Sequence, residues 1–139
     1  MSVKVCDRSQ GKLEVLTKAM DFAAHTIKIC DNDNVFPKRH RLSVNADIIK
    51  EVKMIAKLIN RANTKRSYSK RLELQEQALD LTNDIEIDME IAYRTIRANF
   101  TESKLDYWLK LLLEVRSLLK GWIKSDAQEH RKKVQENRD

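Results

Sequence analysis

The sequence has very few residues that interrupt helices. Its 139 residues include one proline, Pro37, and two glycines, Gly11 and Gly121. Proline lacks the backbone N–H and clashes with the preceding turn of a helix, and glycine in a helix interior costs about 1 kcal/mol relative to alanine. A chain this poor in both leaves room for little other than long helices.

Cysteine and long apolar runs are scarce as well. Cys6 and Cys30 are the only cysteines, without a CxxC spacing or a Cys/His cluster, so we expect a reduced intracellular setting rather than a disulfide framework. The first residues lack the apolar core of a signal peptide, and no stretch approaches the ~20 apolar residues of a membrane span. We therefore predict a cytoplasmic protein with no membrane partner.

The patterns that accompany catalysis or metal binding are also missing. His25, His40 and His130 lie far apart and form neither an HExxH nor a Glu-x-x-His pattern, which argues against a zinc or di-iron site. The isolated glycines form no phosphate-binding loop, and neither a GxSxG elbow nor a cysteine paired with a base is present. We predict no enzymatic activity, no metal, no cofactor and no small-molecule substrate.

Charge, in contrast, is abundant. Charged residues make up 35% of the chain, and 27 Lys and Arg outnumber 21 Asp and Glu to give a net charge of +6. The hydrophobic share of 42% is enough to bury the core of one domain at this length. The positive excess favours an anionic partner, which includes nucleic acid, an acidic protein surface and anionic lipid, but charge alone does not choose among them.

Apolar residues recur at alternating steps of three and four in four segments, as on one face of a helix. The first two helices are predicted at about residues 11–31 and 43–63. The third carries a stripe from Leu74 to Ile96, and the fourth carries the most regular stripe, from Leu105 to Trp122. Four such stripes joined by short links predict an all-α, antiparallel up-down four-helix bundle.

The third predicted helix has two unusual features. Ile85 to Ile91 alternates like a strand, but we interpret it as helix because no turn residues flank it, and Ile87 and Ile91 then form a second apolar strip that needs a second partner. The helix also carries an acidic run, which we interpret as a solvated or partner-facing face, with paired carboxylates for acid/base catalysis as the alternative. The run consists of Glu73, Glu76, Asp80, Asp84, Glu86, Asp88 and Glu90.

The predicted stripes also set the domain organisation. Residues 11–125 form the bundle, residues 1–10 a flexible N-terminus, and residues 126–139 a charged helical extension or tail. Trp108 and Trp122 lie on the fourth stripe, where core anchors are more common than base-stacking platforms.

Basic residues are expected to gather at both ends of an antiparallel bundle. Lys and Arg neutralise phosphates without reading sequence, so these clusters predict salt-dependent, weakly specific nucleic-acid binding. The alternative is that cations at helix C-termini only complement the helix dipole. The first basic cluster is Lys65, Arg66, Lys70, Arg71, Arg116, Lys120 and Lys124, and the second, in the link between the first two helices, includes Lys38, Arg39 and Arg41.

Two short motifs carry a family resemblance. They are Phe36-Pro37-Lys38-Arg39-His40-Arg41-Leu42 and Leu118-Leu119-Lys120-Gly121-Trp122-Ile123-Lys124. With these motifs, residues 11–125 resemble the accessory variability determinants of diversity-generating retroelements, which are four-helix bundles related to proteins encoded in intervening sequences of 23S ribosomal RNA genes. The stretch Ile59-Asn60-Arg61-Ala62-Asn63 departs from the intervening-sequence branch, whereas Lys120 replaces a glycine that the accessory branch often has.

The resemblance implies a specific function. Family members form a basic pentameric ring that binds nucleic acid and partners a reverse transcriptase while template RNA is copied mutagenically into cDNA. We therefore expect a non-catalytic accessory protein whose partners are RNA or DNA, the reverse transcriptase and further copies of itself. The alternatives are a protein of the intervening-sequence type and a pure protein-interaction bundle that docks an acidic partner.

Overall fold

A computed structural model of the chain describes residues 3–38, 44–96 and 99–138, with side chains from residue 14 onward. These residues form the helices α1 (Val3–Asp31), α2 (Ala46–Asn63), α3 (Tyr68–Thr95) and α4 (Glu102–Arg138), and the described ranges contain no strand. The predicted all-helical class and four-helix bundle are thereby confirmed.

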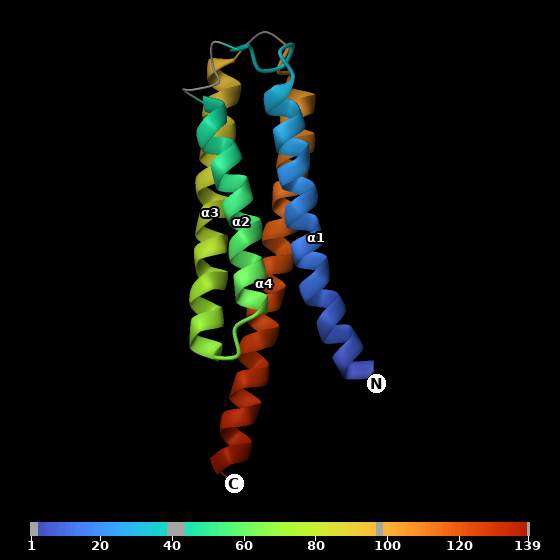
Figure 1. Cartoon of the computed structure of the whole chain (residues 1–139), viewed down its shortest axis with the longest axis vertical. Coiled ribbons are helices and arrows are strands. Elements are labelled where there is room, and N and C mark those ends of the chain that lie inside the picture. Colours follow the sequence, from blue (N-terminus) through green and yellow to red (C-terminus); the bar gives the residue numbers. More distant parts are fainter. Residues whose placement is uncertain (1–2, 39–43, 97–98, 139) are drawn as a thin grey trace.

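Each helix packs on its neighbours in sequence, and α1 also packs on α4. The C-terminal ends of α1 and α3 lie at the same end of the molecule as the N-terminal ends of α2 and α4 (Figure 1). The link between α2 and α3 lies at the opposite end, beside α4 (Figure 1). This arrangement sets the basic link 64–67 far from the 32–38 segment that follows α1.

One helix boundary differs from the sequence-based expectation, and for the segment from residue 126 the structure shows the helical extension rather than the tail as far as Arg138. Helix α1 begins at Val3 rather than near residue 11, because a single glycine weakens a helix without ending it. Helix α4 continues to Arg138 because neither proline nor glycine follows Gly121. Gly121 lies inside α4 and is exposed, and a Cβ added there would meet no atom within 4 Å. Both glycines are therefore helical, and neither marks a boundary.

The core is built around Trp108, whose side chain is fully buried. Its Nε1–H donates to the hydroxyl of Thr26 (2.8 Å), and that hydroxyl donates to the carbonyl of Phe22 (2.7 Å). Phe36 meets the Trp108 ring edge-on, with centroids 6.1 Å apart, so the segment after α1 is anchored in the core. Trp108 is thus a core anchor, as predicted, and Trp122 lies half-buried against the same core.

Polar contacts fix the helix ends at the Phe36 side of the bundle. The amide of Asn45 donates to the carbonyl of Cys30 (3.0 Å), which ties the start of α2 to the end of α1. Thr101 caps α4, because its hydroxyl accepts from the backbone N–H of Lys104 (3.3 Å). Burial raises the pKa of the Cys30 thiol to about 12, with a smaller contribution from the charge of Asp31, so this cysteine stays neutral and unreactive.

Candidate functional site

The first basic cluster is centred on the link between α2 and α3. Lys65, Arg66 and Lys70 are exposed there, and Lys120 and Lys124 are exposed on the neighbouring part of α4. The start of α3 is held against α4 by an ion pair between Arg71 and Asp126, two residues beyond Lys124. The structure therefore brings these five exposed cations to one end of the molecule.

Arg71 organises this end rather than presenting a free charge. Its Nη2 donates to Oδ1 of Asp126 (3.0 Å), its Nε donates to Oδ2, and its Nη1 donates to the carbonyl of Lys65 (3.0 Å). The two charged side chains are only 15% and 8% exposed. Tyr68 lies under the guanidinium and stacks on His130 with ring centroids 4.1 Å apart. The positive charge of Arg71 is therefore neutralised, and its main effect is to order the basic link.

Arg116 lies one helical turn from Lys120 on α4, but its charge is not free. It precedes Asp126 by ten residues, which is ~15 Å along a helix. Its guanidinium contacts Oε1 of Glu86 (2.6 Å) and donates to the carbonyl of Thr82 (2.9 Å), and its side chain is 14% exposed. Arg116 thus joins α4 to the middle of α3, where part of the acidic run lies.

The second basic cluster lies at the other end of the molecule. Lys38 is exposed there, just after the Phe36 anchor, whereas Arg39 and Arg41 fall outside the described residues. Helix α3 spans Tyr68–Thr95, which corresponds to roughly 40 Å. Lys38 and the exposed cations around Lys65 are therefore two separate candidate contact points.

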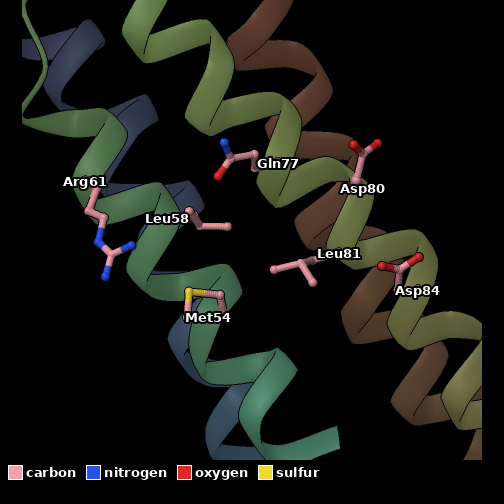
Figure 2. A pocket seen from close by; sticks show the side chains of 7 residues that line it. All are labelled: Met54, Leu58, Arg61, Gln77, Asp80, Leu81 and Asp84. Atoms are coloured by element: carbon pink, nitrogen blue, oxygen red, sulfur yellow. The ribbon is translucent and has the colours of Figure 1, made fainter. Parts of the chain in front are cut away.

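A groove between α2 and α3 carries charge of the opposite sign. Its floor is apolar: Leu58 and Met54 on α2 and Leu81 on α3 face the space between the two helices (Figure 2). Asp80 and Asp84 stand on the α3 rim (Figure 2). The remaining lining residues are Asp47, Lys50, Glu51, Arg61 and Gln77. This acidic groove runs along nearly the whole of α2, from Asp47 near its start to Arg61 near its end.

Two carboxyl groups in the acidic groove share a hydrogen bond. Burial, followed by a hydrogen bond to Asp88 and the charges of Asp88, Asp84 and Asp47, raises the pKa of Glu51 to about 8. The pair therefore holds a proton near neutral pH. The acidic run predicted from the sequence includes Asp88 but not Glu51. The available signal was the spacing of Asp47 and Glu51, since like charges one helical turn apart repel each other.

The described residues supply little for other chemistry. They contain no group of three or more His, Cys, Asp or Glu that is placed to hold a metal ion. None of the helices within the described residues is long and apolar enough to cross a membrane. His25 packs edge-to-face on Tyr107 with centroids 5.1 Å apart, and desolvation, then the charge of Lys28, lowers its pKa. His25 therefore has a structural position on the flank of α1.

Comparison with known proteins gives no assignment. No protein-family model matches the sequence, and neither the curated proteins nor the solved structures yield a match.

Proposed function

We propose that this chain is a non-catalytic accessory protein of a diversity-generating retroelement. It binds template RNA or its cDNA, partners the reverse transcriptase, and acts in the cytoplasm. The observation that carries the nucleic-acid part is the group of exposed cations at one end of the molecule, which lies beside the second sequence motif, 118–124. The motifs themselves support the family part of the proposal.

Phosphate binding follows from how this end is built. Lys65 and Arg66 project from a link whose backbone is held by Arg71, Lys70 lies in the first turn of α3, and Lys120 and Lys124 lie one helical turn apart on α4. Flexible lysines contact phosphate oxygens as point charges and carry no base specificity. The acidic groove repels phosphates and directs a nucleic-acid strand to the ends of the molecule. The proposed binding is therefore electrostatic and weakly specific.

Assembly into a homo-oligomeric, pentameric ring of antiparallel up-down bundles is part of the same proposal. Ile87 and Ile91 on α3 are 60% and 50% exposed and so remain without cover in a single copy. Exposed apolar side chains next to each other on a helix favour contact with another protein surface. This second apolar strip supports contacts between copies.

A salt titration of RNA binding tests the nucleic-acid part. Five neutralised phosphates on a single strand give a slope near −3.5, so the affinity for a labelled single-stranded RNA should fall on the order of 100-fold between about 50 and about 200 mM salt. The variant Lys65→Glu/Lys120→Glu should bind more weakly and with a shallower slope. The matched control is Lys53→Glu/Lys57→Glu, which changes two exposed lysines on α2. Binding that ignores salt, or that weakens equally in both variants, would refute the proposal.

The second candidate is a protein-interaction bundle whose basic ends dock an acidic partner. It rests on the same exposed cations, which can pair with carboxylates as well as with phosphates, as Arg71 and Arg116 do within the chain. In that case Lys65→Glu/Lys120→Glu leaves RNA retention unchanged and abolishes pull-down of the acidic partner. A protein of the intervening-sequence type is distinguished by its gene, which would lie within a ribosomal RNA gene rather than beside a reverse transcriptase.

A further inference from the structure

The last two turns of α4 extend past the rest of the molecule, since His130 still stacks on Tyr68 at the start of α3. After Asp126 the helix continues to Arg138, about 18 Å further, and it projects beyond the link between α2 and α3 (Figure 1). Residues 131–138 are exposed on every side. A single helix of this length is marginal in water unless one of its faces is covered.

The extension is basic overall: Arg131, Lys132, Lys133 and Arg138 outnumber Glu129 and Glu136, and the two lysines lie on the same side of the helix as the two glutamates. Arg131, Val134 and Arg138 follow one another at steps of three and four and so share one face of the helix. Glu129 and Glu136 lie seven residues apart on the opposite side. Val134 is 39% exposed at the centre of the basic face. The extension therefore presents an apolar residue flanked by two arginines.

The acidic groove has the complementary pattern. Its floor of Met54, Leu58 and Leu81 is apolar, and five carboxyl groups line or border it against the two cations Lys50 and Arg61. Along α2 the groove runs from Asp47 to Arg61, about 21 Å, which matches the ~18 Å of the extension.

We propose that the basic face of residues 127–138 of one copy docks in the acidic groove of a second copy. Val134 packs on the floor beside Leu81, and Arg131 and Arg138 pair with the carboxylates of Asp84 and Asp80. The groove within the same copy is out of reach, because the extension points away from it along the axis of α4 (Figure 1). This contact rests on the proposed homo-oligomer and names the surfaces that form it.

The contact is heterologous, since each copy offers an extension and a groove at different places on its surface. Such head-to-tail contacts close into a ring when the rotation between copies allows it. One apolar residue and two ion pairs make a weak single contact, and closure of a ring strengthens it through multivalency. Ile87 and Ile91 lie on α3 next to the Asp84 rim and gain cover in the same assembly.

Two charge-reversed variants test the contact by sedimentation velocity on the full chain. Asp80→Lys/Asp84→Lys reverses the charge on the rim of the groove, and Arg131→Glu/Arg138→Glu reverses the charge on the basic face of the extension. Each should weaken self-association about tenfold or more relative to the wild type, since like charges then face each other. An equimolar mixture of the two variants should recover assembly that neither variant shows alone, because the intact extension of one fits the intact groove of the other and the reversed extension fits the reversed groove. The variant that combines all four substitutions should recover assembly through reversed pairs.

The control is Lys53→Glu/Lys57→Glu, which changes charge outside the groove and should leave assembly unchanged. Oligomers that persist in both test variants would overturn this contact while leaving the proposed homo-oligomer intact. A wild-type chain that stays monomeric at ~200 µM would overturn both. If assembly is unchanged but Asp80→Lys/Asp84→Lys abolishes binding of an unrelated basic amphipathic peptide, the occupant of the groove is another protein. RNA binding is measured separately, so its outcome does not decide this test.

Discussion

Replacement of Asp126 by Asn should destabilise the protein because it leaves Arg71 buried without its counter-charge. The two side chains are only 8% and 15% exposed, and removal of one partner from a buried ion pair typically costs about 3–5 kcal/mol. Arg71 keeps its bonds to the carbonyls of Lys65 and Arg66, so we expect a somewhat smaller loss, about 2–4 kcal/mol. At about 3 °C per kcal/mol for a chain of this size, Tm should fall by roughly 6–12 °C.

Urea unfolding followed by circular dichroism measures this loss, with Asp80→Asn as the matched control. Asp80 also lies on a helix but is exposed, so its replacement should change the unfolding free energy by less than about 0.5 kcal/mol. Limited trypsin digestion gives a second readout, since Lys65 and Arg66 lie in the link that Arg71 orders. Asp126→Asn should speed cleavage there. An Asp126→Asn protein as stable as the control, with unchanged cleavage, would refute the assignment of Arg71 as the residue that orders this link.

Three further changes test other parts of the structure. Thr26→Val leaves Nε1 of Trp108 buried without an acceptor and should cost about 1–3 kcal/mol in urea unfolding, whereas Thr26→Ser keeps the hydroxyl and should cost less; equal losses would contradict the bond. Because the pKa of Glu51 is raised to about 8 in the folded state, the folded chain holds a proton that the unfolded chain releases, and wild-type stability should fall as pH rises from about 5 to about 9. Glu51→Gln keeps a hydrogen-bond donor for Asp88 at every pH. Its unfolding free energy should therefore exceed that of the wild type by a margin that grows with pH to about 1–2 kcal/mol, a value discounted for partial exposure to solvent. A margin that does not change with pH would contradict the shared proton. Cys30 should react with a thiol reagent only at the rate of unfolding, and fast reaction in native buffer would show that its site opens.

Sequence periodicity was sufficient for the helices and most of the core. Trp108 was placed correctly because one buried stripe per helix is a local property, and the 3–4 spacing that encodes it is unbroken from Leu105 to Trp122. The predicted start of α1 was too late because Gly11 was taken to mark the beginning of the helix. The free-energy cost of one glycine in a helix is small compared with the gain from the hydrogen bonds of a helix that continues through it.

The ion pairs between helices could not be predicted from the sequence, for a different reason. Arg71 and Asp126 are separated by 55 positions, and Arg116 pairs with Glu86 across two helices. Their pairing depends on the rotation and axial shift of α3 against α4, which hydrophobic spacing fixes only within about a turn. The shared proton of Glu51 and Asp88 likewise requires the relative placement of α2 and α3. The sequence predicted which basic and acidic residues lie near one another, but not which of their charges are paired within the chain.

Gly121 provides a probe that a typical surface residue does not. Alanine at this position meets no atom within 4 Å and removes the helix penalty of glycine, so Gly121→Ala should be stabilising by about 1 kcal/mol. A loss of RNA binding or of self-association in this variant therefore cannot be attributed to misfolding. It would report that another molecule approaches the bare backbone of α4 between Lys120 and Lys124 more closely than a methyl group permits. A single added methyl group at Gly121 thus tests for close contacts with other molecules, which a single copy of the chain does not contain.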